Sequence, residues 1–249
     1  MADEKSKILV LVEGQKTDYK LMEHLLQVYG IGEKHELVSY NTNIYTLYNE
    51  LFRDGDPESL DILQVLKGHE RDAKKKKLFD QRYSDILLIF DLDPQDPQFS
   101  PEKILEMISF FVESSDMGKL YLNYPMVEAF YHMKSIPDAD YDTYTASMEE
   151  LRAGTYKRRV NQENRNHNYR KFAVDKQECD VVIAQNIEKA WKIAEMQQQE
   201  DMLLPQSWDI LKAQLKKLDE SQLISVLCTC AFYIADYNPR LIQGDSQTT

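Results

Sequence analysis

Two short apolar runs, each ended by acidic residues, constrain the fold of this chain more than any other feature. Residues 7–12 (KILVLV) and 85–90 (DILLIF) consist almost entirely of aliphatic side chains. Continuous apolar runs of this length are typical of strands buried on both faces, which occur in parallel sheets covered by helices. Glu13-Gly14 ends the first run and Asp91-Leu92-Asp93-Pro94 ends the second.

The segments around these two runs alternate between strand and helix patterns. Further strands are predicted at residues 36–40 and 119–122, and helices at residues 19–29, 44–52, 60–66, 101–112 and 126–133. The charged stretch 70–77 (ERDAKKKK) is interpreted as a solvated helix end or a loop. This alternation predicts an α/β fold, in which a parallel sheet is flanked by helices.

The 249-residue chain is predicted to have three parts. Residues 1–135 form the α/β domain, residues 136–177 a polar, basic insertion or loop segment, and residues 178–249 a mostly helical C-terminal region. Cys228 and Cys230 are expected to pack in the core on one of its helices. The three cysteines lack metal-site spacing, and there is no run of about 18 apolar residues that would span a membrane. We therefore expect a cytoplasmic protein with reduced thiols.

Charge is distributed unevenly along the chain. The formal net charge is −12, which argues against broad affinity for nucleic acid. Residues 152–176, however, hold eight basic and two acidic side chains. Such a basic strip, rich in Asn and Tyr, can follow phosphates and stack on unpaired bases. The candidate substrate contacts are Lys157, Arg158, Arg159 and Arg165, and the alternative reading is a solvated helix face.

The acidic residues that end the two apolar runs form the candidate catalytic site. The carboxyl ends of parallel strands are where ligands bind in open α/β sheets, and both motifs lie there. Glu13, Asp91 and Asp93 are expected to meet at this edge, where clustered carboxylates repel one another unless a cation neutralises them. Carboxylate oxygens suit Mg²⁺ or Mn²⁺. The three residues are thus predicted both as metal ligands and as catalytic groups.

The two motifs resemble the signatures of the TOPRIM fold, which topoisomerases, primases and small nucleases share. The motifs are VEGQKTD (residues 12–18) and IFDLDPQD (residues 89–96), and their order and spacing also fit. The resemblance covers about residues 7–135 and implies that Glu13 is the acid/base and that Asp91 and Asp93 are metal ligands. Pro94-Gln95-Asp96-Pro97 stands where topoisomerases and primases have a small residue and Gly. The chain is more similar to nucleases of the bacterial anti-phage overcoming-lysogenisation-defect group and their small stand-alone relatives.

Three further acids are possible members of the site. In NYPMVEAF (residues 123–130), Glu128 resembles the Glu of an Asn-Pro-…-Glu-aromatic element in the same relatives, where it would join or brace the acidic cluster. Asp18 and Asp96 are interpreted as a helix cap and a loop acid rather than as ligands. His132 follows Glu128 by four residues, a spacing at which it can orient that carboxylate.

Other readings of the acidic pair remain open. Asp91 and Asp93 can be turn residues before Pro94. The pair also resembles the haloacid-dehalogenase phosphatase motif, in which the first Asp is a nucleophile. That motif requires Thr or Val where this chain has Gln95, and it usually follows the first strand.

The sequence thus predicts a Mg²⁺- or Mn²⁺-dependent nuclease acting on RNA or DNA. The resemblance implies an effector of anti-phage defence with a partner ATPase. The helical C-terminal region is expected to dock this ATPase or a second copy of the chain. No P-loop is present, so this chain is not expected to hydrolyse ATP itself. The alternative is a non-catalytic interaction or regulatory protein that keeps the TOPRIM scaffold.

Overall fold

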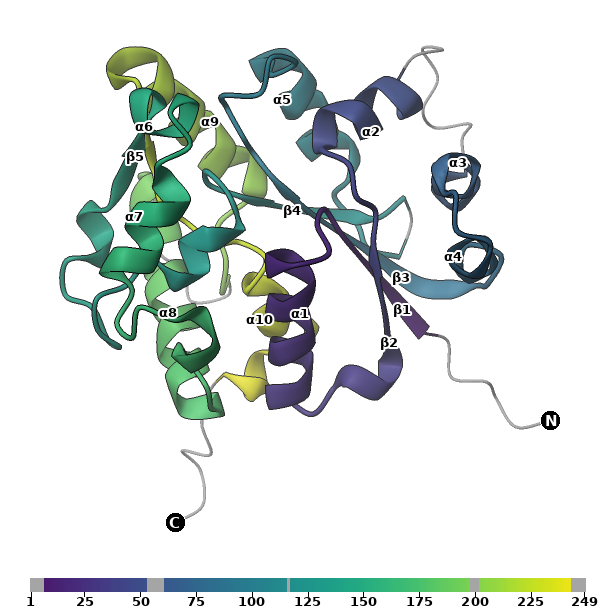
Figure 1. Ribbon diagram of the computed structural model, residues 1–249, viewed down its shortest axis with the longest axis horizontal. Helices are drawn as coiled ribbons and strands as arrows, with labels where there is room; N and C mark the ends of the chain where they lie inside the picture. Colours follow the sequence, from purple (N-terminus) through teal and green to yellow (C-terminus); the bar gives the residue numbers. More distant parts are fainter. Residues whose placement is uncertain (1–6, 53–60, 116, 198–201, 243–249) are drawn as a thin grey trace. The chain divides into compact units, whose positions relative to one another are not determined.

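The computed structural model describes residues 7–52, 61–115, 117–197 and 202–242 (Figure 1). Its contacts divide the chain into two compact units. The first unit comprises Met1–Asp91 and Gln98–Tyr121, and the second comprises Leu92–Pro97 and Leu122–Thr249. The predicted helix at residues 60–66 begins at residue 60, which lies outside the described residues.

The first unit alternates strands and helices as the sequence predicts. Its elements are β1 (Lys7–Val12), α1 (Thr17–Val28), β2 (His35–Ser39), α2 (Ile44–Leu51), α3 (Ile62–His69), α4 (Ala73–Leu78), β3 (Tyr83–Asp91), α5 (Pro101–Phe110) and β4 (Lys119–Asn123). The four strands form an all-parallel sheet in the order β2-β1-β3-β4. The prediction of an α/β fold with a parallel sheet is confirmed.

The helices of the first unit cover both faces of this sheet. Connections between parallel strands are right-handed, so a chain that moves from β1 to β2 and then back across to β3 must place successive connections on opposite faces. Figure 1 shows α1 on one side of the sheet, with α2 and α5 on the other side in contact with each other. Because both faces are covered, Leu9–Val12 of β1 and Leu88–Phe90 of β3 are almost completely buried.

Local capping residues explain where several of these helices begin. The Ser100 hydroxyl accepts a hydrogen bond from the Lys103 N–H at 3.3 Å, and Pro101 occupies the first turn of α5, where its missing N–H costs nothing. Asp72 caps α4 by accepting from the Lys74 N–H at 2.7 Å. The charged stretch 70–77, interpreted from the sequence as a helix end or a loop, therefore forms a short helix from Ala73 onward.

The second unit is mainly helical and contains a small antiparallel sheet. Its elements are β5 (Thr145–Ser147), α6 (Met148–Arg152), α7 (Tyr156–Glu163), α8 (Lys176–Ile193), α9 (Ser207–Ser221), β6 (Leu223–Ser225) and α10 (Phe232–Tyr237), with β5 paired to β6. The expected helical C-terminal region is confirmed. Residues 136–177 contain more regular structure than the predicted loop segment, since they include β5, α6 and α7. Tyr141, Tyr156 and Val160 of this segment are buried.

Two local predictions in the second unit are wrong. Residues 126–133 form a short 3₁₀ helix at Val127–Tyr131 instead of an α-helix. Cys228 and Cys230 are completely buried, as expected, but they lie in the irregular segment between β6 and α10 rather than on a helix. Backbone groups there bond to side chains: the Cys228 N–H donates to Asn186 at 2.9 Å and the Cys230 N–H to Asn123 at 3.2 Å.

Candidate metal centre

Glu13 and Asp91 meet at the carboxyl edge of the parallel sheet. The register pairs Val12 of β1 with Ile89 of β3, so the residues that follow lie side by side. The Glu13 N–H donates to the Ile89 carbonyl at 3.1 Å, and one Glu13 carboxylate oxygen accepts from the Asp91 N–H at 3.2 Å. This second bond orients the Glu13 side chain toward the end of β3.

Asp93 lies two residues beyond Asp91 and begins a turn. The Asp96 N–H donates to the Asp93 carbonyl at 2.9 Å, which confirms the turn reading of this residue. Asp93 has a φ of 40°, in the left-handed region that Asp tolerates better than most residues. The Asp93 N–H donates to the Pro125 carbonyl at 3.0 Å, and the Gln95 amide donates to the Asp93 carboxylate at 3.0 Å. The turn therefore holds the carboxylate as well as reversing the chain.

The carboxylates of Glu13, Asp91 and Asp93 form one cluster. Each offers an oxygen, and the three oxygens lie within 4.8 Å of one another. Chain connectivity keeps the two aspartates together, because two residues of backbone span about 7 Å at most. The geometry therefore joins the three residues that the sequence singled out.

The donor chemistry of this cluster fits a hard divalent cation. Carboxylate oxygens are the usual ligands of Mg²⁺ and Mn²⁺ in proteins. Beside them, the Gln95 amide oxygen is buried and has no hydrogen-bond partner in the described part of the chain. An acceptor without a donor is unfavourable in a buried position, and a cation or its water shell would satisfy it. In the sequence, Gln95 stands out only as a departure from the phosphatase motif, and nothing there indicates the buried position of its amide oxygen.

The electrostatic surroundings of Asp93 also favour a bound cation. Burial is the main cause that raises the pKa of the Asp93 carboxyl above its usual range. The Gln95 hydrogen bond and the Lys157 charge lower this pKa, whereas the charges of Glu128 and Asp96 raise it. A divalent ion would stabilise the ionised carboxylate against this burial.

Asp18 is not the helix cap that the sequence suggested. Lys16 occupies the N-cap position of α1 without a side-chain cap, and Asp18 lies buried in the first turn. A Cβ atom added at Gly14 would lie 2.8 Å from the Asp18 carboxylate. Gly14 therefore lets this carboxylate approach the loop that follows β1, directly after Glu13.

Glu128 lies near Asp93 but outside the cluster of three. Its side chain is 4% exposed, and its carboxylate pairs with the Lys157 ammonium at 3.2 Å. Both groups are close enough to affect the pKa of Asp93. His132 does not orient Glu128, because its ring contacts Glu163 at 3.1 Å and the Tyr156 hydroxyl at 3.3 Å.

Carboxylates neutralise half of the basic side chains between residues 152 and 176. Three of the four candidate contacts are in ion pairs: Lys157 with Glu128, Arg159 with Glu150, and Arg165 with Glu178. Lys176 pairs with Asp180. The cations without a side-chain partner among the described residues are Arg152, Arg158, Arg170 and Lys171, all of which are exposed.

Comparison with models of known protein families, with curated proteins and with solved structures finds no match to this chain. Within the described ranges, no helix combines the length and the apolar character needed to span a membrane.

Proposed function

We propose that this chain is a divalent-metal-dependent nuclease with a TOPRIM-type site. The observation that carries the proposal is the group of Glu13, Asp91 and Asp93 oxygens within 4.8 Å at the carboxyl edge of a parallel sheet. The order and spacing of the two acidic motifs, which resemble those of TOPRIM proteins, support the same assignment.

In this proposal, each carboxylate has a separate role. Asp91 and Asp93 hold Mg²⁺ or Mn²⁺, which supplies a Lewis acid for phosphoryl oxygens when bound. One Glu13 oxygen stays on the Asp91 N–H. The other oxygen moves a proton to or from the reacting group, or contributes to the metal site. The Lys157 ammonium is close enough to lower the pKa of Asp93, and in this proposal it stabilises negative charge on the phosphate.

Substrate binding in this proposal uses the exposed cations of residues 152–176. Arg158 has no side-chain partner within the described part of the chain and is free to contact a phosphate. Lys157, Arg159 and Arg165 would have to exchange their carboxylate partners for phosphates. The anti-phage role and the partner ATPase follow from the resemblance alone. The cytoplasmic location is proposed from the cysteine usage, and self-association from the helical C-terminal region. Co-purification from the native host tests the partner.

The deciding experiment compares the purified full chain with its Glu13→Gln variant. Both are incubated with plasmid DNA, single-stranded DNA and total tRNA in Mg²⁺, Mn²⁺ or EDTA. We expect metal-dependent cleavage that falls by about 100-fold or more in Glu13→Gln, because removal of a group that acts in proton transfer costs about 10²–10⁴ in rate.

Glu23→Gln is the matched control, because Glu23 is an exposed residue on α1 and the charge change is the same. Thermal unfolding with and without Mn²⁺ gives a second readout, since an ion that binds the folded state raises the midpoint. Cleavage that Glu13→Gln retains would refute the assigned site. A Mn²⁺-dependent shift with no cleavage of any substrate would favour the non-catalytic alternative.

A further inference from the structure

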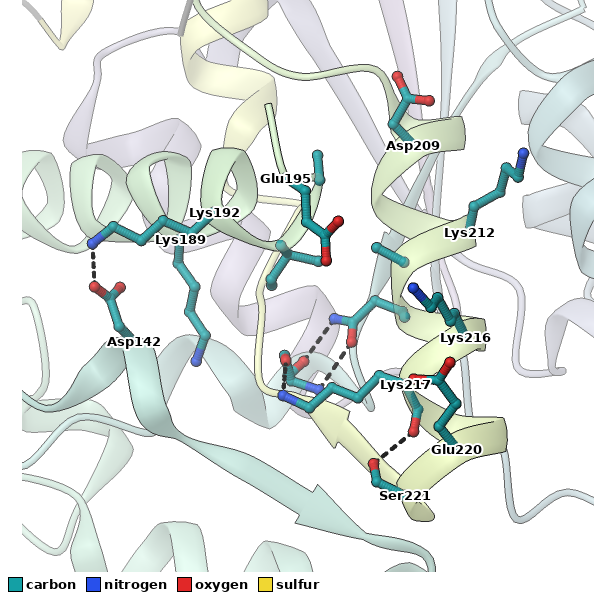
Figure 2. Close-up of a pocket in the computed structure, with 15 residues that line it drawn as sticks. Asp142, Lys189, Lys192, Glu195, Asp209, Lys212, Lys216, Lys217, Glu220 and Ser221 are labelled. Carbon is teal, nitrogen blue, oxygen red and sulfur yellow. Dashed lines mark hydrogen bonds and ion pairs between the residues drawn. The ribbon is translucent and has the colours of Figure 1, made fainter. Parts of the chain in front are cut away.

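A pocket of about 660 Å³ lies in the second unit, between the C-terminal half of α8 and helix α9 (Figure 2). Its volume falls in the range of small-molecule sites, about 300–1,000 Å³. Of the fifteen lining residues, only Ile193, Ala194 and Ala213 are apolar. Walls of this kind suit a charged ligand better than an apolar one. No residue of the acidic cluster lines this pocket.

Lys189 places a buried amine at the pocket. It lies on α8 with 1% of its surface exposed, and its ammonium donates to the Tyr141 and Tyr144 carbonyls at 2.6 and 3.0 Å. No carboxylate in the described ranges forms an ion pair with it. Burial lowers the pKa of Lys189 to about 7, the Asp142 and Asp138 charges oppose this shift, and the Lys217 charge adds to it.

The more buried side of the pocket, here called its floor, consists of Lys189, Lys217, Gln214 and Ser225. Figure 2 shows the Lys189 and Lys217 side chains extending from α8 and α9 into the same space. The Lys217 ammonium donates to the Ser225 hydroxyl at 2.8 Å. Gln214 fixes Ser225 by bonding its backbone N–H and carbonyl at 2.9 and 2.8 Å. The Ser225 hydroxyl proton has no acceptor among the described residues and remains available to a ligand.

Acidic residues are placed toward the more exposed parts of the wall. Asp142 is neutralised by its ion pair with Lys192. Glu195 and Glu220 are exposed and Asp209 is half-buried, whereas the floor consists of the buried Lys189, Gln214 and Ser225 with the half-buried Lys217. The exposed Lys192, Lys212 and Lys216 lie among these carboxylates, whereas the floor contains no carboxylate, so an anion is attracted most strongly to the floor.

We propose that this pocket binds a phosphorylated small molecule of about nucleotide size, with its phosphate on the floor between Lys189, Lys217 and the Ser225 hydroxyl. Two ammonium groups and a hydroxyl give a phosphate several donors, and lysine is a common phosphate ligand. A bound phosphate would also give the Lys189 ammonium an anionic partner, which no carboxylate in the described ranges provides. This proposal stands whether or not the acidic cluster is a nuclease site.

The test is isothermal titration of the full chain with AMP, pyrophosphate and glutarate. EDTA is present, so that the acidic cluster holds no cation. Glutarate is a dicarboxylate with about the same charge as AMP near neutral pH, and it separates phosphate recognition from general anion binding. We expect one molecule of AMP or pyrophosphate to bind per chain, and Lys217→Met to weaken this binding by about tenfold or more.

Lys74→Met is the matched control, because Lys74 is an exposed helical lysine of the first unit and the charge change is the same. If Lys217→Met loses its circular dichroism spectrum, Ser225→Ala replaces it, since both ammonium groups then remain and binding should weaken several-fold. The proposal is overturned if neither phosphate binds at millimolar concentration. It is also overturned if glutarate binds equally well, or if Lys74→Met and Lys217→Met weaken binding equally.

Discussion

At the scale of single residues, backbone groups hold the acidic cluster in place. The Asp91 N–H holds one Glu13 oxygen at 3.2 Å, and the turn that begins at Asp93 holds its carboxylate against the Gln95 amide at 3.0 Å. The side chains are thus held in place without an ion, which would lower the entropic cost of binding at the proposed metal site.

Gly14→Ala should disturb the loop that follows β1. The added Cβ would lie 2.8 Å from the Asp18 carboxylate, so the buried Asp18 side chain, the loop or α1 must shift. We expect a loss of about 1–3 kcal/mol in the free energy of unfolding, which is typical of overpacking. Urea denaturation measures this loss.

Gly68→Ala on α3 is the control for this substitution. A Cβ atom at Gly68 meets nothing within 4 Å, and alanine favours the helix over glycine by about 0.5–1 kcal/mol. This variant should be as stable as the wild type or more so. Equal losses in the two variants would show that the Asp18 contact is not the cause.

His132 should make the protein less stable in acid. Burial lowers its pKa from 6.5 to about 4 in the folded state, despite its bond to Glu163. Between these values the unfolded state binds a proton that the folded state does not, so stability falls as pH falls. The loss from about pH 7 to pH 4 is about 3 kcal/mol for this group.

Urea unfolding across this pH range, for the wild type and for His132→Gln, measures the contribution. The variant should lose less stability than the wild type on acidification, because glutamine does not titrate. Parallel curves for the two proteins would show that His132 titrates alike in both states.

At the scale of elements, α8 organises the second unit through one buried amide. The completely buried Asn186 accepts from the Cys228 N–H at 2.9 Å and from the Tyr141 hydroxyl at 2.6 Å. It therefore ties the helix to the irregular segment before α10 and to the chain before β5. The Cys228 N–H lies outside any helix or strand, so it needs such a partner, and Asn186 is also the acceptor for the buried Tyr141 hydroxyl.

Asn186→Ala should therefore destabilise the protein strongly. The substitution leaves a buried N–H and a buried hydroxyl without partners, which costs about 2–4 kcal/mol in total. Thermal or urea unfolding measures the loss. Gln177→Ala, at an exposed position of the same helix, is the control and should change stability by about 0.5 kcal/mol or less. A similar loss in both variants would contradict the role of the buried amide.

At the scale of the whole molecule, the charge distribution would limit the proposed binding of nucleic acid. The net charge is −12, and half of the basic residues between 152 and 176 pair with carboxylates. The exposed cations without a partner in the described part of that strip are Arg152, Arg158, Arg170 and Lys171. Binding through this strip should therefore involve few phosphates.

The salt dependence of binding tests this limit. For duplex DNA in EDTA, the slope of log K against log salt is about −0.9 for each phosphate contact, so four contacts give a slope of about −4. We expect no steeper value. Arg158→Gln should make the slope shallower by about 0.9, and a slope near −7 in the wild type would show that the paired cations also bind.

Most elements of the first unit were predictable because their residues carry strong local signals. The strands β1 and β3 are continuous apolar runs, and α5 begins with a Ser cap and a Pro at its first position. The second unit was less predictable. Val127–Tyr131 is buried on all sides as a 3₁₀ helix, so no apolar stripe distinguishes it from an α-helix in the sequence.

The sequence by itself predicted the parallel sheet and three carboxylates at its carboxyl edge, because apolar runs that alternate with helix patterns are local features of the chain. Tertiary structure decided which charges remain available. Lys157 pairs with Glu128 and His132 with Glu163. Lys189 is buried, and no carboxylate in the described ranges forms an ion pair with it. These partners are 29 to 31 residues apart in the two pairs. Such pairing depends on how distant segments pack, which no local pattern encodes.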